Sequence, residues 1–202
     1  MRRLPLALCI HKFKGLSLIF RTTEELQEYV NKGNNVEYVF FWGHQSKGSA
    51  IDKSCFSQWY ESSFSENGIE YMTAEHYMMA EKARLFGDEI IYKKIISASN
   101  PGEAKALGRE VKGFEERRWI EHRFNIVVTG NVLKFKQNEA LGDFLLNTDG
   151  RVLVEASPVD KIWGVGLGEG NRKIKNPNLW RGQNLLGFAL MEVRDVLQES
   201  HP

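Results

Sequence analysis

A run of helical patterns between residues 73 and 148, with no strand-type segment inside it, constrains the fold of this chain most. Thr73 is an N-cap residue in front of AEHYMMAEKARLF, and residues 88–97 carry a second helical pattern. In NPGE at 100–103, Asn100 caps a third helix whose first position is Pro101. A long helical pattern covers 115–137, and ALGDFLLNT continues it as a short helix.

Strand-type segments are few and lie outside this run. EYVFFWG at 37–43 and RVLVEAS at 151–157 are apolar runs typical of strands, and 56–64 reads as an irregular aromatic strand or turn. Glycines make 164–182 a long loop, and an amphipathic helix ends the chain. Strands and helices do not alternate, so we predict an α+β fold: a mostly helical single domain with a small β-sheet.

The length of 202 residues fits one domain with a short addition. We assign residues 1–37 to an N-terminal extension, with a candidate strand at 15–20 and a short helix capped by Thr22 or Thr23. Residues 38–202 then form the main domain.

Composition excludes several classes of protein. A formal net charge of +1 calls for neither nucleic acid nor a membrane surface, and no stretch reaches the ~20 apolar residues of a transmembrane helix. The apolar run near the N-terminus stops at His11 and Lys12 without a cleavage site, so we expect no secretion and a cytoplasmic protein. Cys9 and Cys55 match no zinc spacing and are expected to be reduced thiols, and the histidines form no metal cluster, so we predict no metal.

The helix that begins after Thr73 carries a candidate site. Helical spacing puts Glu75, Met78, Met79 and Lys82 on one face. A carboxylate in the first turn lies in a favourable dipole field, which keeps it ionised. The alternative is a routine first-turn acid with a solvated lysine.

The tryptophans and the segment after residue 155 form two further patterns. Tryptophans beside glycine or charge are typical of a ring-binding pocket, with ordinary packing as the alternative for at least two, Trp180 included; the five are Trp42, Trp59, Trp119, Trp163 and Trp180. Asp160 precedes Trp163 by three positions on a turn, which can present a carboxylate and a flat ring to one ligand. The glycines from 164 to 170 resemble a phosphate cradle but lack the strand-turn-helix frame of a dinucleotide site, so a flexible loop is the default.

Eight segments in a fixed order carry a resemblance to a known family. They are F-W-G, F-S-Q-W-Y, T-A-E-H-Y-M-M-A-E-K-A, L-G-R, W-I-E-H-R, K-F-K-Q-N, L-V-E-A-S-P-V-D-K-I-W-G-V-G-L and G-Q-N-L-L-G-F-A-L-M-E-V-R. Over about residues 38–198 the chain resembles the YbiA-like, or NADAR, family of N-glycosidases. The resemblance implies the YbiA-like fold and hydrolysis of N-glycosidic bonds. We predict no cofactor.

The resemblance also implies roles for single residues. Positions that match the family's motifs are Glu75, Lys82, Trp119, Asp160, Trp163 and Asn184. We predict that Glu75, Asp160 and Lys82 are catalytic and that the substrate is bound by Trp42, Ser57, Trp59, Trp119, Trp163, Gly164 and Asn184. Glu75 is expected to position water at the anomeric carbon, and Asp160 to hold ribose hydroxyls or share the acid–base role. Trp119 and Trp163 are expected to stack on the leaving base.

The substrate implied by one branch of the family is a ribosylamino-pyrimidine phosphate of riboflavin biosynthesis, a small nucleotide-like molecule. Another branch removes ADP-ribose from guanine, and for that alternative, with ADP-ribosylated nucleic acid as partner, Arg172, Lys173 and Lys175 are expected to line a groove. A third alternative is a module that binds ADP-ribose-type ligands without catalysis. Substrate choice stays open because the chain departs from the short bacterial form of the family at Gln58, at Val165 and in a longer loop between 166 and 184.

Overall fold

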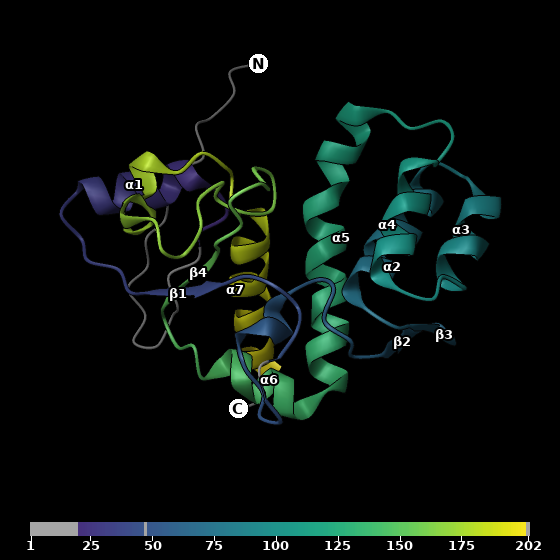
Figure 1. Ribbon diagram of the computed structural model, residues 1–202, viewed down its shortest axis with the longest axis horizontal. Coiled ribbons are helices and arrows are strands. Elements are labelled where there is room, and N and C mark those ends of the chain that lie inside the picture. The colour runs from purple at the N-terminus through teal and green to yellow at the C-terminus, as the bar shows by residue number, and fades with distance from the viewer. Residues whose placement is uncertain (1–19, 47, 201–202) are drawn as a thin grey trace, which may run out of the picture.

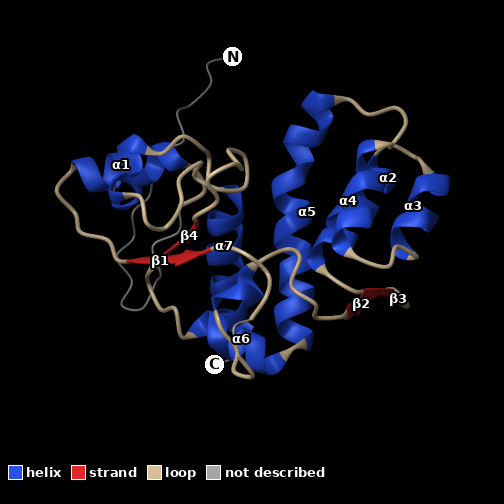
Figure 2. Cartoon of the chain, viewed as in Figure 1, coloured by secondary structure: helices blue, strands red, loops and turns tan. Residues whose placement is uncertain are grey.

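The computed structural model describes residues 20–46 and 48–200, and these form seven α-helices, three 3-10 helices and four strands (Figures 1 and 2). The predicted α+β class is confirmed. The α-helices are α1 (Thr23–Asn31), α2 (Ala74–Leu85), α3 (Glu89–Ile96), α4 (Pro101–Arg109), α5 (Glu116–Gln137), α6 (Glu139–Leu146) and α7 (Leu185–Ser200). The other elements are β1 (Tyr38–Phe41), β2 (Phe64–Glu66), β3 (Ile69–Tyr71), β4 (Val152–Glu155), η1 (Lys53–Phe56), η2 (Arg172–Lys175) and η3 (Pro177–Leu179).

Side-chain caps begin the helices at the positions that the sequence predicted. The Thr73 side chain accepts from the backbone N–H of His76 at the start of α2. Asn100 does the same for α4, with Pro101 in the first turn, and Thr22 rather than Thr23 caps α1. These caps satisfy amide groups that have no partner inside the helix, so the helix starts are fixed locally.

The predicted small sheet is two separate pairs of strands within the described residues. β1 and β4 are parallel, with Phe41 opposite Glu155, so the carboxyl ends of both strands lie at one edge. β2 and β3 form an antiparallel hairpin that the sequence interpretation missed. Its turn is Asn67-Gly68, both with positive φ, which is a short-range hairpin signal.

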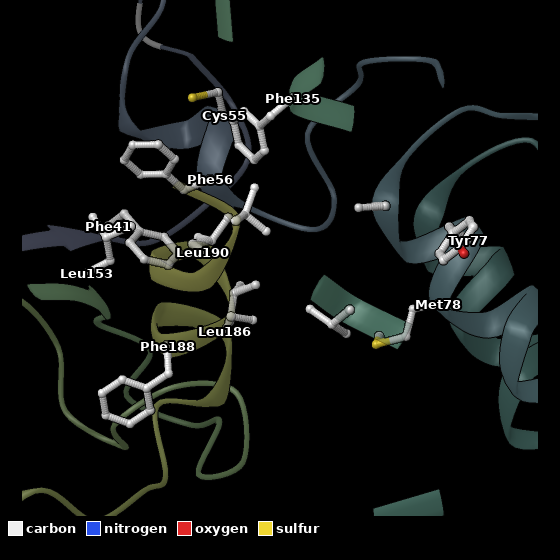
Figure 3. Packing of buried hydrophobic residues seen from close by; sticks show 14 of the residues in the cluster. Phe41, Cys55, Phe56, Tyr77, Met78, Phe135, Leu153, Leu186, Phe188 and Leu190 are labelled. Carbon is white, nitrogen blue, oxygen red and sulfur yellow. The ribbon is translucent and has the colours of Figure 1, made fainter. Parts of the chain in front are cut away.

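The core forms where α7 packs on β4 and on α5. Leu153, Phe188 and Leu190 are fully buried there, and the rings of Phe41 and Phe56 pack in the same cluster with their centroids 5.5 Å apart (Figure 3). β4 is a continuous apolar run because its residues 152–154 are buried on both faces. α5 lies between α7 and the group α2, α3 and α4, so the molecule has two sides that meet along α5 (Figure 1).

The described part of the N-terminal extension packs against this body. Leu26 on α1 is fully buried, Thr23 Oγ1 donates to the carbonyl of Gln183 at 3.1 Å, and Gln27 Nε2 donates to that of Pro177 at 2.9 Å. Cys9 and nearly all of the strand predicted at 15–20 lie outside the described residues. No helix in the described ranges has the length and apolarity to cross a membrane.

Candidate functional site

A pocket lined by charged, aromatic and aliphatic side chains opens between the two sides of the molecule, with a volume of about 360 Å³, which is within the range of small-molecule sites. Its walls come from segments that are far apart in the sequence. The residues that line it are Ser57, Gln58, Trp59, Glu75, Met78, Met79, Lys82, Lys105, Gly108, Arg109, Trp119, Glu155, Asp160, Ile162, Trp163 and Leu186.

Glu75 contributes a buried carboxylate from the first turn of α2. The residue is 2% exposed, and its Oε1 has no hydrogen-bond partner among the described residues. Burial raises the pKa of Glu75 to about 7, against the opposing effects of the Lys105 charge and a hydrogen bond from Trp59. Its backbone N–H donates to the carbonyl of Gln58 at 2.9 Å, which fixes the helix start against the 57–59 segment. Near neutral pH this carboxyl group can exchange a proton in either direction.

Glu155 contributes a second carboxyl group from the carboxyl end of β4. Its Oε2 is buried and has no hydrogen-bond partner within the described ranges. Burial, together with the negative charges of Asp160 and Glu75, raises the pKa of Glu155 to about 8, against the opposing effect of the Lys105 charge. Two carboxyl groups with shifted pKa values in one pocket are a common feature of acid–base sites.

Three cations share the pocket with these acids. Lys82 Nζ donates to the carbonyl of Gly108 at 2.7 Å and lies 4.4 Å from the ring centroid of Phe114. Burial lowers the pKa of Lys82. Lys105 and Arg109 lie one turn apart on α4, and theirs are the positive charges that lower the pKa of Glu75. The cations that act on Glu75 are therefore on the neighbouring helix α4, rather than at Lys82 on its own helix.

Asp160 organises the turn that carries Trp163. Its Oδ1 accepts from the backbone N–H groups of Ile162 and Trp163, both at 2.8 Å, and its own N–H donates to Ser157 Oγ at 3.0 Å. These bonds hold the Trp163 ring in the pocket wall. Trp119, from the start of α5, lines the same pocket, so the structure brings together the acid and the two rings that the sequence singled out.

The 57–59 segment is held by a buried lysine. Lys134 on α5 is fully buried and donates to the carbonyls of Cys55 at 2.7 Å and Ser57 at 3.0 Å. Gln58 is 7% exposed, and neither atom of its amide has a partner among the described residues. The amide can therefore give one donor and one acceptor to a ligand.

Three predicted binding residues do not line the pocket. Trp42 is 62% exposed at the end of β1. Gly164 lies behind the wall, where a Cβ would contact the carbonyl of Glu155 at 2.9 Å. Asn184 is fully buried and bonds to the backbone of Leu153 and Glu155. The basic residues predicted for a groove, Arg172, Lys173 and Lys175, are exposed on η2 and are also absent from the lining.

Sequence reasoning missed Glu155, Lys105 and Arg109 as pocket residues. Glu155 ends a strand, where parallel strands present their carboxyl ends to a ligand, and the two cations share one face of a capped helix. Trp180, expected to pack in an ordinary way, donates from its indole to the carbonyl of Ile174 at 2.7 Å. The described residues include no group of three or more His, Cys, Asp or Glu placed to hold a metal ion.

Comparison with known proteins places this chain in a family. The NADAR domain model matches residues 40–198. The chain is 46% identical to N-glycosidase R617 of Acanthamoeba polyphaga mimivirus over 169 residues, which is 81% of this chain and 98% of the viral protein. It is 32% identical over 146 residues to riboflavin biosynthesis protein VVA0006 of Vibrio vulnificus, covering 72% of this chain and 36% of that protein.

A solved structure supports the same assignment. The NMR structure of the E. coli protein YbiA matches with a TM-score of 0.64 at 27% identity, over 81% of this chain and 86% of YbiA. The match of the family model covers most of the chain, and the first relative matches over nearly its whole length. This chain therefore belongs to the NADAR domain family.

Proposed function

We propose that this protein hydrolyses the N-glycosidic bond of ribosylamino-pyrimidine phosphates, the intermediates of riboflavin biosynthesis. Cleavage of an N-glycosyl bond is the activity for which several of its relatives are named. The observation that carries the proposal is Glu75, a buried carboxylate whose Oε1 has no partner among the described residues, in a pocket with aromatic walls and cations.

In this proposal Glu75 activates the attacking water. N-glycoside cleavage passes through an oxocarbenium-like sugar, so a carboxylate beside the anomeric carbon both stabilises positive charge and accepts a proton from water. Its pKa of about 7 leaves a large fraction ionised near neutral pH, while the carboxylate stays basic enough to take the proton.

The other pocket residues suit the remaining parts of such a substrate. The rings of Trp119 and Trp163 offer stacking surfaces for a leaving base. Lys82, Lys105 and Arg109 offer positive charge for a phosphate. Asp160 keeps Oδ2 for ribose hydroxyls, since its Oδ1 is used in the turn. The Gln58 amide suits a base edge with one donor and one acceptor.

The riboflavin assignment draws on two relatives. VVA0006 and the maize protein PYRR, 34% identical over 146 residues, are both named riboflavin biosynthesis proteins. Their matching segments are parts of longer chains, 36% and 22% of their lengths.

A second candidate is removal of ADP-ribose from guanine. A single phosphate does not require all three cationic side chains of the pocket, and together they also suit a diphosphate. This candidate needs the same Glu75 and differs only in the substrate.

Both candidates are tested by incubating the protein with the ribosylamino-pyrimidine phosphate and with ADP-ribosylated guanosine, side by side, and measuring released ribose phosphate or ADP-ribose. We expect faster turnover of the pyrimidine substrate, and a loss of about 100-fold or more for Glu75→Gln. Glu70→Gln, an exposed glutamate on β3, is the matched control. Faster turnover of the guanine substrate would favour the second candidate over the first. Binding of either ligand without release of ribose phosphate or ADP-ribose would indicate a binding module without catalysis.

A further inference from the structure

We propose that Glu155 is the general acid of this site and gives its proton to the nitrogen that leaves the sugar. The inference rests on the proposed function, because it assigns the half of the hydrolysis that Glu75 does not perform. None of the roles derived from the family resemblance falls on Glu155.

The position of Glu155 carries the inference. It ends β4, on the side of α5 opposite α2, so the two carboxyl groups enter one pocket from the two sides of the molecule. Its Oε2 is buried in a pocket wall without a partner in the described part of the chain. The backbone behind it is fixed: its N–H donates to Asn184 Oδ1 at 3.0 Å, and its carbonyl accepts from Val165 at 3.0 Å. A polar atom so buried and so fixed needs a partner, and the pocket is where a substrate supplies one.

The two carboxyl groups have unequal surroundings, and the inequality separates their roles. Glu75 accepts a hydrogen bond from Trp59 and lies at a helix N-terminus, and both favour its ionised form. Glu155 has no side-chain donor in the described structure, and the negative charge of Asp160 opposes its ionisation. Near neutral pH Glu155 therefore keeps its proton while much of Glu75 has lost its own.

Asp160 is less suited to this step. Its Oδ1 already accepts two backbone N–H groups in the turn that carries Trp163, so that oxygen has no proton to give. Glu155 Oε2, by contrast, accepts no hydrogen bond from the part of the chain that the structure describes.

The reaction then balances with one water molecule. The water oxygen bonds to the anomeric carbon and one water proton passes to Glu75. The carbon–nitrogen bond breaks with its electron pair on nitrogen, which takes the proton of Glu155. The products are the sugar hydroxyl and the free amine, and the proton on Glu75 returns to Glu155 through solvent, which restores both groups.

Charged groups on every wall that faces Glu155 set the pH range in which these proton transfers can occur. They are Glu75 and Lys82 on α2, Lys105 and Arg109 on α4, and Asp160 in the following loop. With Glu75 ionised above about 7 and Glu155 protonated below about 8, kcat/KM should be bell-shaped in pH with its maximum between these values.

The test separates leaving groups by their need for a proton. Wild type, Glu155→Gln, Glu75→Gln and the control Glu70→Gln are assayed on a ribosylamino-pyrimidine phosphate and on the 4-nitrophenyl riboside 5-phosphate, whose leaving group departs unprotonated. We expect the turnover of Glu155→Gln to fall about 100-fold or more on the amine substrate and less than about tenfold on the nitrophenyl substrate. The turnover of Glu75→Gln should fall on both substrates. The alkaline limb of the pH profile should disappear only in Glu155→Gln.

A second measurement does not depend on turnover. Titration of the glutamate carboxyl carbons by NMR should show Glu155 protonated at pH 7, with a lower pKa in Glu75→Gln because a like charge is gone. Wild-type rates on the amine substrate in folded Glu155→Gln, or Glu155 ionised at pH 7, would overturn the inference and leave the proposed function standing. Wild type without activity on any N-glycoside would instead contradict the proposed function.

Discussion

Asn184 fixes the backbone of Glu155: its Oδ1 accepts from the Glu155 N–H at 3.0 Å, while its Nδ2 donates to the carbonyl of Leu153 at 2.9 Å. The asparagine thus joins the start of α7 to the end of β4, and it does so from a left-handed backbone conformation with φ of 54°. Family resemblance points to Asn184 as a substrate-binding residue, yet its side-chain amide forms hydrogen bonds with the backbone of β4, the strand that ends at Glu155.

Replacement of Asn184 should therefore act on Glu155. We expect Asn184→Ala to lower kcat about tenfold and to lower stability by roughly 1–3 kcal/mol, because two buried backbone groups lose their partner. Asn184→Gly removes the same bonds but suits the positive φ, so it should be the more stable variant with a similar loss of kcat. Kinetics with thermal unfolding of both variants checks this, and an increase in KM alone would point to direct substrate binding.

The tryptophans divide into pocket and surface residues. Trp163→Ala should raise KM about tenfold or more, since stacking of a base on an aromatic ring contributes roughly 1–3 kcal/mol. Trp42→Ala should leave KM within about twofold, because Trp42 is exposed outside the pocket lining. Equal effects of the two variants on KM would place Trp42 at the substrate after all.

Glu75 should reduce stability at high pH. Burial raises its pKa from the unfolded value of 4.5 to about 7, so its contribution to stability is fully present below about 4.5 and is lost as the pH rises through 7. Glu75→Gln should be more stable than wild type at pH 9, by up to roughly 3 kcal/mol. Urea unfolding at pH 5, 7 and 9 measures this, and a difference that does not grow with pH would contradict the shifted pKa.

Lys134 should be required for the shape of the 57–59 segment. Lys134→Met leaves the carbonyls of Cys55 and Ser57 without their donor, at a cost of roughly 2 kcal/mol or more, and should lower kcat through Trp59 and Gln58. The control is Lys136→Met, an exposed lysine on the same helix. Burial lowers the pKa of Lys134 to about 8, so the folded state gains stability relative to the unfolded state as the pH rises from 8 towards 10.5. That gain should be absent in Lys134→Met and present in Lys136→Met.

The loop before α7 should tolerate a methyl group at one glycine and not at another. A Cβ at Gly182 would collide with the carbonyl of Gly164 and come within 2.7 Å of Lys161 Cα, whereas a Cβ at Gly170 meets nothing within 4 Å. Gly182→Ala should cost roughly 2 kcal/mol or more and disturb the Asp160 turn, while Gly170→Ala stays within about 0.5 kcal/mol of wild type. Similar melting temperatures of the two variants would rule out this packing.

The sequence by itself determined the helices and the first acid. Caps such as Thr73 and Asn100 and the spacing of Glu75, Met78, Met79 and Lys82 are local, because they involve groups within two turns of one helix. The hairpin at Asn67-Gly68 was just as local, and its signal was present but overlooked.

Only the tertiary structure decided which residues share the pocket and which carboxyl group keeps a proton. Trp163 lines the pocket and Trp42 does not, although both stand beside a glycine in the sequence. Glu155 ends a strand, and its pKa is raised by burial and by negative charges on α2 and in the loop that follows β4. Burial and charge–charge interactions depend on distances in the folded structure. The sequence therefore contains these acids, but the packing of distant segments sets their pKa values.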